Sequence, residues 1–164
     1  MAYVPPLGMP IDEVRRELDR IRHPLRIAVR RSKNAFNVGA IIRTSHSFLV
    51  KEILLIGAEP WYHRAAMGMH RYEHVVEVAS EGAFVAMARE RKWHVLALEK
   101  EEARHQLWDA PMPNGTVIVV GNEEEKVGRE ILDAADPESP MSAAAEDEDD
   151  DLPDWLLLAL GGGR

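Results

Sequence analysis

The most informative segment of the sequence reads Asn37-Val38-Gly39-Ala40-Ile41-Ile42-Arg43-Thr44. It stands where apolar residues that alternate over 25–29 give way to apolar residues spaced three and four apart. We therefore predict a strand over 25–29 and a helix over 37–48, with Asn37 capping the helix N-terminus. Asn37 and Arg43 would then lie less than two helical turns apart. A guanidinium at this place could bind a phosphate with its planar fork.

Apolar segments on either side of this stretch predict the remaining elements. Strands are expected at 52–56, 75–78, 93–98 and 116–120, and further helices at 10–22, 81–91 and 127–135. Strands that alternate with helices indicate an α/β fold: a mostly parallel sheet with helices on both faces. Such sheets bind ligands outside the carboxyl ends of their strands. Those ends are expected at 30–31, 57, 98–99 and 121–123.

Length and composition limit the class of protein. A chain of 164 residues allows one domain with appendages. The absence of cysteine excludes a disulfide framework and a thiolate metal site. We find no signal-peptide pattern at the N-terminus, and no apolar run approaches the ~18 residues that a membrane span needs. The expected location is the cytoplasm, with no membrane partner.

The net charge of -8 is unevenly distributed. Residues 1–45 hold nine Lys and Arg against four acids, a balance of 9 - 4 = +5, whereas residues 133–154 hold ten acids and no base. A basic N-terminal third could meet a polyanion, although each arginine could equally be a solvated surface residue. The basic run from Arg26 to Lys33, beside Arg43, favours nucleic acid.

Two motifs carry a resemblance to a known family. The segment 37–44 closely resembles the first motif of the SpoU (TrmH-like) branch of the SPOUT superfamily, and Gly121-Asn122-Glu123 resembles the start of the second. The resemblance runs from about Leu25 to about Asp136. It implies a knotted fold, S-adenosylmethionine as cofactor, transfer of a methyl group to the 2'-oxygen of a ribose in tRNA or rRNA, and a homodimer without metal.

The same resemblance implies roles for individual residues. The catalytic residues would be Arg43, Asn37 and Glu123, with Arg43 near the ribose 2'-hydroxyl. An arginine stays protonated, so it would act by polarisation or with a close anionic partner. The implied cofactor-binding residues are Leu98, Gly121, Asn122 and Glu123, and the implied RNA-binding residues are Arg30, Arg31, Lys33 and Arg43.

Two segments depart from the family pattern. Lys126 stands where the family has glycine, and a positive φ there would cost a lysine about 1 kcal/mol. The third motif, Pro-Met followed by Ser-Leu-Asn, closes the cofactor loop and the trefoil knot in the family. Here the corresponding region contains Pro140-Met141-Ser142 without Ser-Leu-Asn, and the acidic run 146–151 follows. A block of like charge is typical of disorder.

These observations divide the chain into three parts and leave two functions open. We predict a helical extension over 1–23, a SPOUT methyltransferase-like domain over 24–136, and an acidic tail with a short apolar end over 137–164. The alternative to a methyltransferase is a non-catalytic RNA-binding module that has lost its cofactor loop. The tail could also be a regulatory segment that competes with RNA for the basic N-terminal face. A nucleotide-binding domain of another family is disfavoured, because no Gly-x-Gly-x-x-Gly follows the first strand.

Histidines and tyrosines gather in one further stretch. His63, His70 and His74, with Tyr62 and Tyr72, could form an RNA-facing loop with stacking rings or ordinary surface. Their spacing does not favour a metal site. His46, one turn after Arg43, is expected to be a helix-face residue rather than a catalyst.

Overall fold

The computed structural model describes residues 6–99, 105–106, 109–122, 126–135 and 142–143. Predicted helices and strands alternate as expected, joined by two 3-10 helices, η1 and η2, that were not predicted. The order is α1 (Ile11–Asp19), β1 (His23–Arg30), α2 (Ala35–Ser47), β2 (Val50–Ile56), η1 (His63–Ala66), η2 (Met69–Arg71), β3 (Val75–Val78), α3 (Glu81–Glu90), β4 (His94–Leu98), β5 (His105–Gln106), β6 (Thr116–Val120), α4 (Arg129–Ala134) and β7 (Ser142–Ala143).

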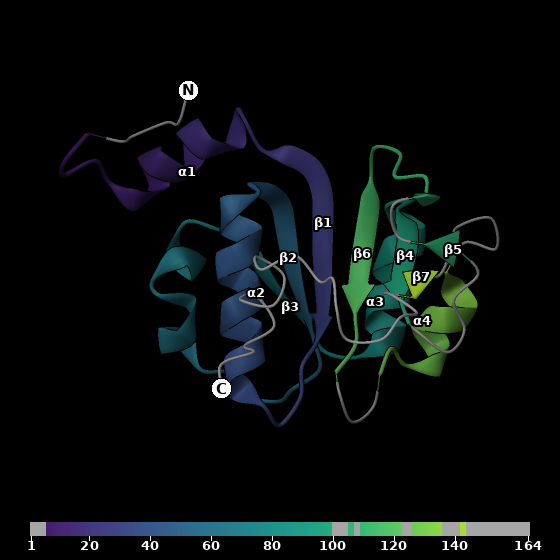
Figure 1. Ribbon diagram of the computed structural model, residues 1–164. Coiled ribbons are helices and arrows are strands. Elements are labelled where there is room, and N and C mark those ends of the chain that lie inside the picture. The colour runs from purple at the N-terminus through teal and green to yellow at the C-terminus, as the bar shows by residue number, and fades with distance from the viewer. Residues whose placement is uncertain (1–5, 100–104, 107–108, 123–125, 136–141, 144–164) are drawn as a thin grey trace, which may run out of the picture.

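The strands form one parallel sheet, in the order β3-β2-β1-β6-β4-β7-β5. β1 lies between β2 and β6, with Ile27 opposite both Ile53 and Ile118. Because the neighbouring strands are parallel, the carboxyl ends of β1, β2, β6 and β4 share one edge of the sheet, where their arrowheads point in Figure 1. The predicted parallel α/β sheet is confirmed, and its carboxyl edge is where a ligand is expected.

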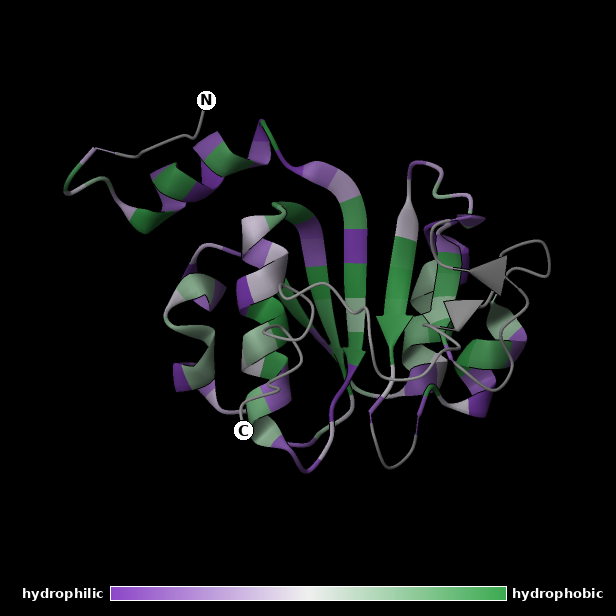
Figure 2. Ribbon diagram, in the orientation of Figure 1, coloured by the Kyte–Doolittle hydropathy of each residue, from purple (hydrophilic) through white to green (hydrophobic). Residues whose placement is uncertain are grey.

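Two apolar layers cover the two faces of the sheet. Leu55 packs with Ile42 of α2 on one face, and Leu54 packs with Phe84 of α3 and Ile131 of α4 on the other. All five side chains are fully buried, and each such burial stabilises the fold by about 1.5–3 kcal/mol. Figure 2 shows the apolar residues concentrated in β2 and β6, at the centre of the molecule. Helices on both faces of the sheet are thus confirmed.

The start of α2 differs from the prediction. Asn34, not Asn37, caps the helix, since its side-chain oxygen accepts a hydrogen bond from Phe36 N at 3.2 Å and its backbone is not helical. Both asparagines suit a cap, but the helix begins at Ala35, so Asn37 already lies inside the first turn. The prediction for Asn37 as the cap is therefore wrong.

Gly39 explains why the motif has a glycine in the middle of a helix. A Cβ atom on Gly39 would lie 2.5 Å from Ala65 Cβ and 2.8 Å from Ala66 N. Glycine thus lets the backbone of α2 pack directly against η1. The cost of a helical glycine, about 0.5–1 kcal/mol, is offset by this close contact.

The termini of several elements also differ from the expected ones. α1 ends at Asp19, with Val14 and Leu18 buried, while Ile21 is 54% exposed. The last described helix spans six residues rather than the whole of 127–135.

β7 was not predicted: Ser142 pairs with Leu98, inside the segment predicted as a tail. The rest of that tail, and with it the predicted knot, lie outside the described residues.

Candidate active site

The first half of the site is carried by α2. Because β1 and β2 are parallel, α2 runs from the carboxyl edge of the sheet back toward the amino edge (Figure 1). Arg43 is exposed, about 12 Å along the helix from Ala35 at 1.5 Å per residue. Among the described residues its guanidinium has no hydrogen bond or ion pair. Asn37 is half-buried, about 1.7 turns earlier in the helix. The Arg43 fork is therefore available to an anion or a hydroxyl group.

The second half is the loop that follows β6. The Asn122 carbonyl accepts a hydrogen bond from Lys126 N at 2.9 Å, so the chain turns back on itself. A Cβ atom on Gly121 would lie 2.3 Å from the Lys126 carbonyl carbon, which only a glycine avoids. Lys126 has a φ of 55°, a left-handed conformation that costs a side-chain-bearing residue about 1–2 kcal/mol. The expectation of strain where the family has glycine is confirmed.

Neighbouring strand ends hold this loop in place. Val127 N donates a hydrogen bond to Glu99 at 3.3 Å, just after β4. The Asn122 amide donates to the Arg31 carbonyl at 3.4 Å, just after β1. Leu98 and Val120 are opposite each other in the sheet. Leu98 and Gly121 thus lie at the ends of neighbouring strands, at the carboxyl edge. Their contact with a cofactor stays a prediction. Glu123 lies outside the described residues.

The predicted RNA-binding residues fall into two groups. Lys33 and Arg43 are exposed. Arg30 is partly buried, with its Nε 2.8 Å from Glu81. Arg31 is only 9% exposed; its guanidinium donates to the Gly57 carbonyl and pairs with Glu77. Arg30 therefore connects the end of β1 to the start of α3, and Arg31 connects it to the ends of β2 and β3. Their contact with RNA stays a prediction.

Sequence reasoning missed a buried ionic network under α2. Glu73 is 2% exposed, and its two oxygens lie 2.6 Å from Arg22 Nη1 and 2.6 Å from His46 Nδ1. Breaking such a buried pair typically costs about 3–5 kcal/mol. The network secures the end of α2 one turn beyond Arg43. The three residues come from distant parts of the chain, and no local pattern connects them.

The histidines of the aromatic stretch do not form one cluster. The His63 ring stacks on Trp61 at 3.8 Å, and His70 meets both rings edge-on. Burial, then the nearby His63 and Arg71, lower the pKa of His70. His74 lies elsewhere, with Nε2 2.7 Å from Asp19. Within the described ranges, no group of three or more His, Asp or Glu could hold a metal ion.

No helix of the described residues is long and apolar enough to span a bilayer.

Comparison with known proteins gives a family match and several solved structures of the same fold. The model of the SpoU rRNA Methylase family matches residues 24–144. The A. aeolicus TrmH/SpoU tRNA modifying enzyme is 20% identical, with a TM-score of 0.65, over 87% of this chain and 74% of that one. The AdoMet-bound rRNA methyltransferase from Sinorhizobium meliloti is 20% identical, with a TM-score of 0.66, over 87% and 57%. No curated protein matches the sequence.

A third solved structure is close to this chain in length. It is described by its title as giving insight into "the 2-OH methylation of C/U34 on tRNA", and is 15% identical, with a TM-score of 0.63, over 84% of this chain and 92% of that one. At these identities the structures establish the fold alone. The family match covers α2 with Arg43, the loop after β6, and β7, which lies beyond the predicted domain end at 136. The chain belongs to the SpoU family of RNA methyltransferases.

Proposed function

We propose that this chain is an S-adenosylmethionine-dependent RNA 2'-O-ribose methyltransferase that acts on tRNA or rRNA. The observation that carries the proposal is a family match that spans both motif segments, with Arg43 exposed on α2. The chain covers just over half of the S. meliloti enzyme, 57% of its length, so the activity is inferred from the site.

The substrate half of the proposed site is α2. The Arg43 guanidinium has five N–H donors and stays protonated, so it would polarise the ribose 2'-hydroxyl or hold an adjacent phosphate. The proton would then leave to an anionic partner such as that phosphate. Asn37, on the same helix, would orient the substrate or the Arg43 side chain.

The cofactor half is the carboxyl edge of β4 and β6. We assign the peptide groups of Leu98, Gly121 and Asn122, together with Glu123, to the cofactor site, since parallel sheets bind ligands at this edge. S-adenosylmethionine would supply a methyl group on a sulfonium. Holding it against the ribose oxygen can provide about 7–11 kcal/mol of the barrier. The AdoMet-bound S. meliloti structure supports this choice of cofactor.

We further propose that the active form is a homodimer. Arg43 comes eight residues after the start of α2, a helix that runs away from the carboxyl edge of the sheet. The two halves of the site would then lie apart within one chain. A second copy could bring its Arg43 to the first copy's loop. Phe36 near the start of α2, Phe48 at its end and Met67 just after η1 are exposed, at 61%, 62% and 69%. A partner could cover these apolar side chains. The expected location of the enzyme is the cytoplasm.

A methyl-transfer assay tests the function directly. Full-length protein and S-adenosylmethionine are incubated with unmodified bulk tRNA or rRNA, and 2'-O-methylated nucleosides are measured after digestion. We expect transfer by the wild type and a loss of at least about 100-fold for Arg43→Ala, the usual scale for losing a hydrogen-bond donor that stabilises developing charge. RNA binding without transfer, together with no cofactor binding by calorimetry, would support the non-catalytic module instead.

A further inference from the structure

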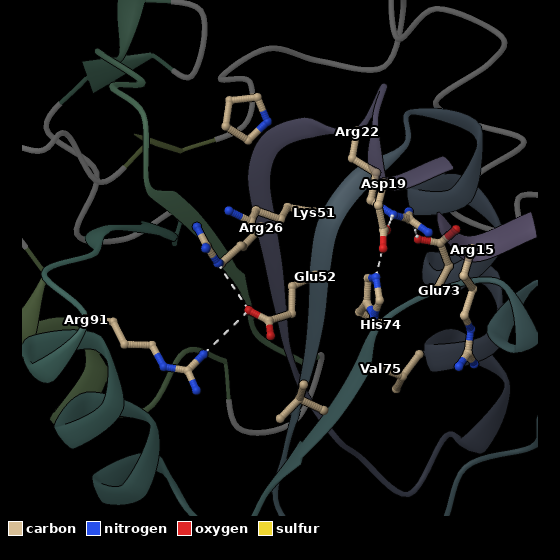
Figure 3. A pocket seen from close by; sticks show the side chains of 12 residues that line it. Arg15, Asp19, Arg22, Arg26, Lys51, Glu52, Glu73, His74, Val75 and Arg91 are labelled. Atoms are coloured by element: carbon tan, nitrogen blue, oxygen red, sulfur yellow. Dashed lines mark hydrogen bonds and ion pairs between the residues drawn. The ribbon is translucent and has the colours of Figure 1, made fainter. Parts of the chain in front are cut away.

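A groove of about 740 Å³ lies at the amino ends of β1, β2 and β3, opposite the edge proposed to bind the cofactor. We call it the amino-edge groove. Figure 3 shows that its charged side chains come from α1, from the first residues of β1 and β2, from the segment before β3, and from the end of α3. Segments far apart in the sequence therefore build one polar surface.

The amino-edge groove carries excess positive charge on a chain of net charge -8. Its cations are Arg15, Arg22, Arg26, Lys51 and Arg91, and its carboxylates are Asp19, Glu52 and Glu73. With His74 neutral the balance is 5 - 3 = +2. Positive potential at this place is therefore a local feature, because the composition of the whole chain would give the opposite sign.

The excess charge sits at one end of the groove. At the α1 end, Arg22 lies between Asp19 at 2.8 Å and Glu73 at 2.6 Å. Burial would raise the pKa of Asp19, but hydrogen bonds from Arg22 and His74 lower it overall, so this carboxylate is charged at neutral pH. With Arg15, two cations there balance two carboxylates, and the surplus belongs to the other end.

At that other end three cations surround one carboxylate. Glu52 Oε2 lies 3.2 Å from Arg26 Nε and 3.8 Å from Arg91 Nη1. Lys51, on the same strand, is exposed and has no hydrogen bond or ion pair among the described residues. Figure 3 shows Lys51 and Arg26 extending toward the same side of the groove, with Glu52 between Arg26 and Arg91. Among the described residues that line this end, two positive charges are left uncompensated.

The two guanidiniums are held in place before any ligand arrives. Arg26 Cζ lies 4.6 Å, and Arg91 Cζ 5.1 Å, from the centre of the Trp93 ring. Stacking on an aromatic ring and pairing with a shared carboxylate both fix a guanidinium. Each arginine has five N–H donors, and Glu52 uses few of them. The remaining donors suit the oxygens of a phosphate.

We propose that Lys51, Arg26 and Arg91 bind a backbone phosphate of the RNA substrate, at a contact separate from the methyl-transfer site. The inference rests on the proposed function, because it takes RNA as the ligand. Trp93 is covered by two guanidiniums, so this end of the groove offers charge rather than a ring for a base. The contact therefore positions RNA without reading its sequence.

The salt dependence of RNA binding tests the proposal. The dissociation constant of the full-length protein for unmodified tRNA is measured between about 50 and 200 mM salt, where each lost phosphate contact lowers the slope of log K against log salt by about 0.7–0.9. Because the three cations share one phosphate, we expect the double variant Lys51→Gln/Arg91→Gln to lower that slope by about this amount and to weaken binding roughly threefold to tenfold, and each single variant to show part of this effect. Arg91→Lys should keep most of the slope, since it keeps the charge.

Arg89→Gln is the matched control. Arg89 is exposed in α3, two residues before Arg91, and does not line the groove. Losing its charge should therefore leave the salt dependence of RNA binding unchanged. Groove variants that bind like Arg89→Gln, or a wild type that binds no RNA at low salt, would overturn the proposal. Slope changes at the groove in a protein that transfers no methyl group would refute the proposed function and leave the RNA contact standing.

Discussion

The two halves of the proposed site both depend on a glycine, but on different kinds of contact. At Gly39 the missing Cβ atom makes room for a separate element, so that α2 packs on η1 at Ala65 and Ala66. At Gly121 it makes room for the same loop, whose backbone returns at Lys126 and Val127. The substrate half is therefore fixed by tertiary packing between two segments, whereas the cofactor half is fixed by a local turn that includes a left-handed lysine. The conformation of the substrate half should therefore be insensitive to most single substitutions, whereas a single substitution in the loop can change the conformation of the cofactor half.

The largest predicted effects are on methyl transfer, from substitutions that disable one half of the proposed site at a time. Arg43→Ala should lower methyl transfer at least about 100-fold and leave cofactor affinity unchanged. Gly121→Ala should lower both, because its Cβ atom displaces the loop backbone. Titration calorimetry with S-adenosylmethionine and the transfer assay separate the two results.

Mixing these variants tests whether the halves come from different chains. The Arg43→Ala and Gly121→Ala proteins are unfolded, mixed and refolded together, so that some dimers contain one copy of each. If a second copy supplies Arg43, each mixed dimer should have one intact site. Activity should then rise above that of either variant alone. No recovery, in a mixture shown to contain the mixed dimer, would contradict the shared site.

A smaller effect is expected from Gly39→Ala, which breaks the packing of the substrate half. The added Cβ atom meets a Cβ and two backbone atoms at 2.5–2.8 Å, and overpacking of this kind costs about 1–3 kcal/mol. Urea unfolding should show the loss of stability. Ala40→Gly, at a neighbouring position of the same helix, controls for helix propensity and should cost only about 1 kcal/mol.

Lys126→Gly tests whether the loop of the cofactor half is strained. Glycine relieves the positive φ, so we expect a gain of about 0.5–1 kcal/mol in unfolding free energy after the entropy of glycine is counted. Lys126→Ala removes the same side chain and keeps the strain, so it should give no gain. Equal stability of the two variants would show that the turn is not strained in solution.

The smallest predicted effect is a pH dependence at His70, beside η1. The pKa of His70 is lowered in the fold, so its neutral form is favoured. Its contribution to stability is present above about pH 6.5, the ordinary pKa, and is lost as the pH falls through that value toward the folded pKa. Thermal unfolding between about pH 7.5 and 5 should therefore show a steeper loss for the wild type than for His70→Gln.

The sequence was sufficient for the features that local patterns specify. Apolar runs identified β2 and β6 at nearly their observed bounds, and the glycine expected at Lys126 pointed to the left-handed turn found there. Choosing between Asn34 and Asn37 as the cap was not possible from residue type, because both suit it.

Features that depend on tertiary adjacency were not predictable. Glu73 became the centre of a buried network only because β3 and α2 bring it to Arg22 and His46. The same is true of Lys51 and Arg91 in the amino-edge groove, which lie on different elements. The periodicity of apolar residues predicts each helix or strand separately, but not which charged side chains of different elements come into contact.

The strand order also constrains the sequence of events during synthesis. β1, β2 and β3 are consecutive neighbours and can pair as soon as residue 78 has left the ribosome. β4 has no such neighbour: it pairs with β6, which is made later, and with β7, made later still. For that interval the apolar side chains of β4 stay without their sheet partners, and long-range pairing of this kind is slow and prone to aggregation. A nascent chain stalled after residue 98, but not residue 116, has left the ribosome should therefore be bound readily by chaperones.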